Sequence, residues 1–135
     1  MRLRAIDTKV LARYLTNDDP KQSRLARELL DELPSPDDLF LITIPVICEL
    51  SWLLRRPRYG LNREQIANAW DHLLGSGRFR FQARAELMRA LEQFRQGPAD
   101  LSDYLILHLS RQVGASEVLT FDRDFASSEQ VSLLE

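Results

Sequence analysis

The sequence has few of the residues that usually indicate a disulfide, a cysteine-based metal site or a basic nucleic-acid surface. Cys48 is the only cysteine, which excludes an intramolecular disulfide and a zinc site built from cysteines. Lysine occurs only at Lys9 and Lys21, and the formal net charge is −2, so no global basic field indicates a nucleic-acid partner. The remaining positive charge is arginine, which suits phosphate recognition, although genomic composition is the simpler explanation of its frequency.

Several longer patterns are missing as well. No apolar run is long enough for a signal peptide or a membrane span, so we expect a soluble, cytoplasmic protein with no membrane partner. No phosphate-binding glycine loop or Gly-x-Ser-x-Gly motif is present, which argues against an NTPase or a serine hydrolase. With 135 residues, 44% of them hydrophobic and 28% charged, we expect one globular domain over residues 1–135, without repeats or linkers.

Short apolar segments alternate with amphipathic ones along the chain. Strands are predicted at residues 2–7, 39–43, 78–81, 118–120 and 131–134, and helices at 8–15, 20–33, 45–56, 62–74, 83–96 and 100–113. The run at 39–43 is typical of a strand buried on both faces, and 78–81 of an edge strand. In the helix over 20–33, four leucines are expected to face inward: Leu25, Leu29, Leu30 and Leu33. This alternation predicts an α/β fold, a three-layer α/β/α sandwich with a mostly parallel central sheet.

Acidic residues recur where such a fold places its ligand sites. They follow predicted strands, begin a predicted helix or lie within an apolar helix: Asp7, Glu49, Asp100, Asp103, Asp122 and Asp124. The carboxyl ends of parallel strands form the usual ligand-binding edge of an open sheet. Clustered carboxylates repel one another and take up protons unless a cation compensates. Oxygen ligands without cysteine or histidine favour Mg²⁺ or Mn²⁺.

Each acid also has a purely structural interpretation. Asp7 is placed to cap a helix, a role worth about 1 kcal/mol. Glu49 is either a buried carboxylate, which is costly unless paired or metal-bound, or a member of a narrow solvent-facing stripe. Asp100 and Asp103 have the spacing of a capping box, and the pair at 122 and 124 suits a turn.

Three segments together resemble a known family: Ile6-Asp7-Thr8-Lys9-Val10-Leu11, Asp100-Leu101-Ser102-Asp103-Tyr104-Leu105-Ile106 and Leu119-Thr120-Phe121-Asp122-Arg123-Asp124-Phe125. In order and spacing the chain resembles a PIN-domain ribonuclease, and most of all the VapC-type toxins of bacterial and archaeal toxin–antitoxin pairs. The resemblance covers essentially the whole chain, and Val46-Ile47-Cys48-Glu49-Leu50 supplies the acidic helix residue of that family.

The resemblance implies a PIN-like fold and a Mg²⁺- or Mn²⁺-dependent endoribonuclease, the toxin of a type II pair. Its substrate would be RNA, its partner a cognate antitoxin, and its usual assembly a homodimer. The resemblance further implies four catalytic, metal-binding acids: Asp7, Glu49, Asp103 and Asp122. Accessory or indirect roles would fall to Asp100, Asp124, Thr8 and Thr120. Lys9 departs from the family, which often carries asparagine at that position.

A basic and aromatic group lies at the end of the predicted helix at 45–56 and just after it. Arg55, Arg56 and Arg58, with Tyr59, have the chemistry to grip RNA through phosphate contact and stacking. Arginines at a helix C-terminus also interact favourably with the helix dipole, which is the structural explanation. Lys9 is a further candidate phosphate contact.

The remaining candidates are given structural roles. We expect Trp52 and Trp70 to serve core or dimer packing, and His72 and His108 to have no ligand role. Two other functions remain open: a PIN nuclease for RNA processing outside a toxin–antitoxin pair, and a PIN-like module that binds RNA or a partner without cutting. A receiver or phosphoryl-transfer domain is a remote third, because no suitably placed lysine follows a late strand.

Overall fold

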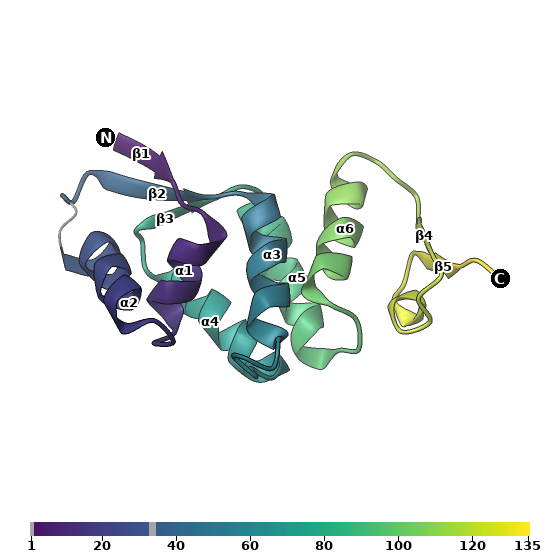
Figure 1. Ribbon diagram of the computed structural model, residues 1–135. Coiled ribbons are helices and arrows are strands. Elements are labelled where there is room, and N and C mark those ends of the chain that lie inside the picture. The colour runs from purple at the N-terminus through teal and green to yellow at the C-terminus, as the bar shows by residue number, and fades with distance from the viewer. Residues whose placement is uncertain (1, 33–34) are drawn as a thin grey trace. The chain divides into compact units, whose positions relative to one another are not determined.

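A computed structural model describes residues 2–32 and 35–135. The chain divides into two compact units, the first ending at Gln82 and the second spanning Ala83–Glu135. The elements of the first unit are β1 (Arg2–Ala5), α1 (Thr8–Leu15), α2 (Pro20–Arg27), a π-helical turn (Glu28–Glu32), β2 (Asp38–Ile42), α3 (Ile44–Arg55), α4 (Arg63–Gly75) and β3 (Phe79–Phe81) (Figure 1). Those of the second unit are α5 (Arg84–Gln96), α6 (Leu101–Gln112), β4 (Val118–Thr120), a 3-10 turn (Phe125–Ser127) and β5 (Val131–Leu133).

The strands of the first unit form a parallel sheet in the order β1-β2-β3. Leu3 pairs with Leu39, and Phe40 pairs with Phe79. As the alternating sequence predicts, β3 is an edge strand. Because all three strands run the same way, their carboxyl ends meet at one edge, and Asp7 follows β1 at that edge.

One face of this sheet supplies the core of the first unit. Phe40 and Ile42 of β2 are fully buried, and the ring of Phe79 lies 6.4 Å from that of Phe40 and 6.4 Å from that of Tyr14 in α1. Helix α1 therefore covers this face. On the other face the β2 side chains are only half-buried, so the prediction that the 39–43 strand is buried on both sides is wrong.

The segment predicted as a helix at 20–33 is α-helical only as far as Arg27. Asp19 caps α2 by accepting a hydrogen bond from the Gln22 amide, and Pro20 takes the first helical position. The α-helix then widens into the π-helical turn after Arg27. Leu30 is fully buried as expected, but Leu25 is 53% exposed, which corrects the prediction that it faces inward. Leu33, which was also predicted to face inward, lies outside the described residues.

A polar network joins the end of α1 to the turn after α3. The carboxylate of Asp18 accepts hydrogen bonds from Thr16 (2.8 Å) and Tyr59 (2.9 Å). It also forms ion pairs with Arg13 of α1 (3.0 Å) and Arg58 (2.9 Å). Burial opposes ionisation, but these hydrogen bonds and charges outweigh it and lower the pKa of Asp18. The network therefore fixes two helix ends of the first unit against each other.

In the second unit α5 packs against α6, and β4 pairs in parallel with β5. The ring of Tyr104 in α6 meets that of Phe125 edge-on at 6.2 Å, and its hydroxyl accepts a hydrogen bond from the Ala99 amide. Helix α6 ends before Gly114, whose φ of +95° lies in the left-handed region that favours glycine. Across the described residues of both units, no helix combines the length and apolar character needed to cross a membrane.

The cap of α4 is complete and offers a test of the fold. Asn62 accepts a hydrogen bond from the Gln65 amide, and the Gln65 side chain accepts one from the Asn62 amide. We expect Asn62→Ala to lower the free energy of unfolding by about 1 kcal/mol, since this capping bond is lost. Urea denaturation measures the change, with Asn17→Ala in an exposed loop as the matched control. An Asn62→Ala variant as stable as the control contradicts the capping role.

Candidate functional site

Asp7 and Glu49, the predicted site acids of the first unit, both have exposed side chains. Asp7 caps α1, and its Oδ1 accepts a 2.8 Å hydrogen bond from the Thr8 amide, so the capping interpretation is confirmed. Glu49 lies on α3 and is exposed, so the interpretation of a buried carboxylate is wrong. Helices α1 and α3 pack together, which brings these two residues to one place.

That place is a cleft of about 400 Å³ in the first unit, which we call the acid cleft. Its lining comes from the start of α1 and the second half of α3: Asp7, Thr8, Lys9, Glu49, Trp52, Leu53 and Arg56. Two carboxylates and two cationic side chains therefore face the same hollow. A cleft with this balance can hold a cation and still receive a negatively charged substrate.

Thr8 gives the cleft an unusual feature. Its side chain is 6% exposed, and its Oγ1 is buried without a hydrogen-bond partner among the described residues. Leaving a buried hydroxyl unsatisfied costs about 1–3 kcal/mol. Together, Asp7, Glu49 and Thr8 present only oxygen donors, the chemistry that Mg²⁺ and Mn²⁺ prefer. The residues present therefore fit a hard divalent cation.

The second unit holds the other predicted acids. Asp100 and Asp103 form the capping box of α6, in which the Asp103 carboxylate accepts a 3.2 Å hydrogen bond from the Asp100 amide. Burial raises the pKa of Asp103, the negative charges of Asp100 and Asp122 raise it further, and the bond from the Asp100 amide opposes them. Asp122 is thus close enough to act electrostatically on Asp103.

The loop after β4 is organised around the Asp122 carboxylate. Its Oδ1 accepts hydrogen bonds from the amides of Asp124 (2.9 Å) and Phe125 (3.3 Å). The Asp122 amide in turn donates to Oγ1 of Thr120 at 3.0 Å. The turn-forming interpretation of Asp122 is confirmed, and Thr120 supports the same loop. Within residues 2–32 and 35–135, no three acidic, histidine or cysteine side chains come together as a ready metal site.

The predicted RNA-binding arginines occupy different environments. Arg58 forms its ion pair with Asp18, and its guanidinium lies 5.8 Å from the centre of the Tyr59 ring. Arg55 is exposed on α3. Arg56 lines the acid cleft, as does Lys9. The structure therefore separates Arg58, which holds the Asp18 network, from two cations that face the carboxylates.

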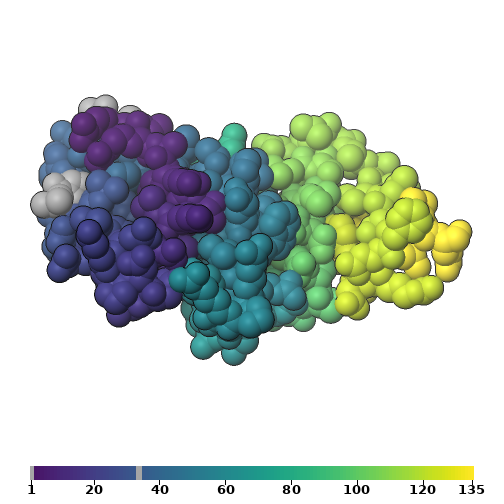
Figure 2. Space-filling model, in the orientation of Figure 1, coloured from purple at the N-terminus to yellow at the C-terminus, as the bar shows by residue number. Residues whose placement is uncertain are grey.

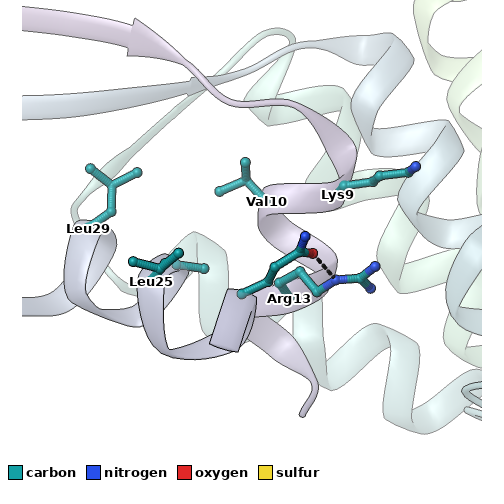
Figure 3. A pocket seen from close by; sticks show the side chains of 7 residues that line it. Lys9, Val10, Arg13, Leu25 and Leu29 are labelled. Atoms are coloured by element: carbon teal, nitrogen blue, oxygen red, sulfur yellow. Dashed lines mark hydrogen bonds between the residues drawn. The ribbon is translucent and has the colours of Figure 1, made fainter. Parts of the chain in front are cut away.

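A second hollow of about 340 Å³ lies between α1 and α2 and is mainly apolar. Figure 3 shows Val10 of α1 facing Leu25 and Leu29, and α1 and α2 both reach the visible surface of the first unit in Figure 2. We call this hollow the α1–α2 groove; its lining residues are Lys9, Val10, Arg13, Gln22, Leu25, Ala26 and Leu29. The exposure of Leu25 follows from its position in this groove. Lys9 lines both the groove and the acid cleft.

Comparison with known proteins identifies the family. The sequence-family model of the PIN domain matches residues 5–129, nearly the whole chain. The chain belongs to the PIN domain family. The predicted class, an α/β fold with parallel strands, is confirmed, and family membership supports a nuclease.

Other comparisons are more distant. No curated protein sequence matches the chain. Among solved structures, VapC20 of Mycobacterium tuberculosis, a toxin that cleaves the sarcin–ricin loop, is similar at 18% identity and a TM-score of 0.42. The match covers 97% of this chain and 98% of that one.

Sequence reasoning missed two lining residues of the acid cleft, Trp52 and Leu53. Trp70 is fully buried, and its Nε1 donates to Oγ of Ser51 at 3.1 Å, which confirms core packing for that residue. Trp52 is 49% exposed and faces the cleft, so it is not a core residue. The sequence did carry a signal for Trp52 at the site: it lies three residues after Glu49, which places both side chains on one helix face.

The unsatisfied hydroxyl of Thr8 leads to a stability prediction. Thr8→Val keeps the side-chain shape and removes the buried polar atom, so in EDTA we expect a free energy of unfolding equal to or above that of the wild type. If the hydroxyl helps to hold the cation, the same variant gains less stability from added Mg²⁺ or Mn²⁺. Thermal unfolding with and without metal measures both effects. A variant that is clearly less stable in EDTA contradicts the assignment of an unpartnered hydroxyl.

Proposed function

We propose that this PIN-domain chain is a metal-dependent endoribonuclease and the toxin of a type II toxin–antitoxin pair. The observation that carries the proposal is the cleft in which Asp7 and Glu49 lie beside the unpartnered Thr8 hydroxyl. A site of oxygen donors in a nuclease family supports phosphodiester hydrolysis assisted by a divalent cation. The added charges of Lys9 and Arg56 support a polyanionic substrate.

From the family resemblance we propose metal-ligand roles for four carboxylates, those of Asp7 and Glu49 in the first unit and those of Asp103 and Asp122 in the second. When bound, Mg²⁺ or Mn²⁺ supplies water activation and charge neutralisation at the phosphodiester. Asp100, Asp124, Thr8 and Thr120 have supporting roles, by ordering the carboxylates or lining their surroundings. The hydrogen bond that the Thr8 amide donates to Asp7, for example, fixes the orientation of that carboxylate before any ligand binds.

Lys9 and Arg56 bind the RNA in this proposal. A cleft with only the carboxylates of Asp7 and Glu49 would repel phosphate, whereas the two cations bring the formal charge of these four side chains to zero. Hydrolysis by water leaves a 5′ phosphate and a 3′ hydroxyl. A ribonuclease that uses the 2′ hydroxyl as nucleophile does not leave these ends, so end analysis reports the chemistry.

Asparagine substitutions separate catalysis from local structure. Asparagine caps helices as well as aspartate does, so Asp7→Asn should retain the wild-type melting temperature. The loss of a charged ligand should slow Mg²⁺- or Mn²⁺-dependent cleavage of a structured RNA pool by about 100-fold or more, equivalent to about 3 kcal/mol. Asp122→Asn, which keeps an acceptor for the loop amides, should behave in the same way.

The matched control is Asp19→Asn. Asp19 also caps a helix, so this variant makes the same change in the same local role and should cleave like the wild type. Cleavage that persists in EDTA, or in Asp7→Asn at the wild-type rate, contradicts the assignment. If the wild type binds RNA and never cuts it, the chain is a binding module instead.

We assign the antitoxin to the α1–α2 groove. Its apolar lining, with Lys9 and Arg13 beside it, suits an amphipathic segment that carries apolar and acidic side chains. Because Lys9 also lines the acid cleft, a segment bound in the groove reaches the residues proposed for RNA binding. Inhibition would then follow from occupation of neighbouring surfaces. The homodimer stays a prediction from the resemblance, and the cytoplasmic location stays a prediction from the lack of a long apolar run in the sequence.

A charge in the groove should uncouple inhibition from cleavage. Leu25→Glu places a carboxylate among apolar groove residues, and we expect growth arrest by the expressed chain to continue even when the protein encoded beside it is co-expressed. Cleavage by the purified variant should equal that of the wild type. Val113→Glu, at another exposed apolar position, is the control and should remain inhibited. Full inhibition of Leu25→Glu would remove the groove from the proposal.

A further inference from the structure

We propose that Trp52 is a stacking platform for an unpaired RNA base in the acid cleft. This inference rests on the proposed function, because it specifies how that cleft takes its substrate. The indole lies on α3, is 49% exposed and lines the hollow that contains Asp7 and Glu49. Among the described residues that line this hollow, Trp52 is the only one with an aromatic side chain.

The position of Trp52 follows from helix geometry. Trp52 is three residues after Glu49, a spacing that places both side chains on one face of α3, and Arg56 directly follows the last residue of that helix and lines the same hollow. An acid and an indole on the helix and a guanidinium at its C-terminal end therefore line one hollow. Lys9 lines the same hollow from α1.

This combination has the chemistry of single-stranded nucleic-acid binding. Proteins that bind single strands pair cationic side chains, which contact the phosphates, with aromatic rings on which bases stack. Here Arg56 and Lys9 supply the cations, and the half-exposed indole of Trp52 supplies the ring. A base within a duplex is already stacked and paired, so the substrate class is RNA with an unpaired nucleotide at the cleft.

The two tryptophans of the chain have different surroundings, and only Trp70 is a core residue. Trp70 is fully buried, contacts the ring of Phe81 and donates its indole N–H to Ser51. Trp52 is exposed at the cleft instead. A second copy of this chain packed on Trp52 is the competing occupant, and it predicts that loss of the indole changes the molecular mass in solution.

The two tryptophans make the test direct. RNA octamers of adenylate are titrated into the wild type in EDTA at low salt, where metal-dependent cleavage does not occur, and tryptophan fluorescence is recorded. We expect quenching, because the exposed indole stacks on a base. An abasic octamer with the same length and charge should bind through its phosphates without quenching.

Substitution at position 52 completes the test. In Trp52→Leu only Trp70 remains, so we expect no quenching and about ten-fold weaker binding of octaadenylate, with unchanged binding of the abasic octamer. Trp52→Phe should recover most of the affinity, because the ring is restored. In cleavage assays with metal, KM should rise in Trp52→Leu while kcat changes little.

Each other outcome decides against a stated claim. Binding of octaadenylate with no quenching, or equal affinity in Trp52→Leu, overturns the stacking role even if the wild type cleaves RNA. Quenching by the wild type without any cleavage in Mg²⁺ or Mn²⁺ overturns the proposed nuclease and leaves the stacking role standing. A fall in molecular mass in Trp52→Leu with unchanged RNA binding assigns the residue to a second copy of the chain.

Discussion

The 2.8 Å hydrogen bond from the Thr8 amide to Asp7 fixes where α1 begins after β1. This bond also determines what the acid cleft contains, because the first turn of α1 supplies Asp7, Thr8 and Lys9 to its lining. A carboxylate that caps a helix is held by a backbone donor and cannot swing away from the end of the strand. The requirement for a well-formed helix start and the requirement for a positioned acid are therefore met by the same atoms.

A polar network joins the two helices that line the cleft. The Asp18 network joins Arg13, near the end of α1, to Tyr59 and Arg58 in the turn after α3. The network therefore ties α1 to the end of α3 that carries Trp52 and Arg56 of the cleft. Arg58 is committed to this network, whereas Arg56 faces the carboxylates. The two arginines on either side of Pro57 thus have different surroundings, Arg58 in the Asp18 network and Arg56 at the cleft.

Local sequence signals were sufficient for most of the secondary structure. The caps at Asp7, Asp19 and Asn62 and the breaks at glycine and proline depend on neighbouring residues alone, and they placed the helices within a few residues. Exposure was harder, because it depends on which element packs against which. For this reason the sequence left the exposure of Glu49 open, and the prediction that Leu25 faces inward was wrong. Trp52 was assigned to packing because its helix is apolar, although its spacing from Glu49 already placed it beside an acid.

Helix capping explains the local geometry of Asp7 but not the identity of every residue around it. Asn62 and Asp19 show that both asparagine and aspartate serve as caps in this chain, so capping by itself does not require a charge at position 7. Nor does capping explain the buried hydroxyl of Thr8, which has no partner in the described part of the protein. The proposed divalent cation would account for both features at once, because the carboxylate would stabilise it and it would satisfy the hydroxyl oxygen. The proposed metal site is therefore a more complete explanation of this helix start than capping alone, and the cap would be part of that site.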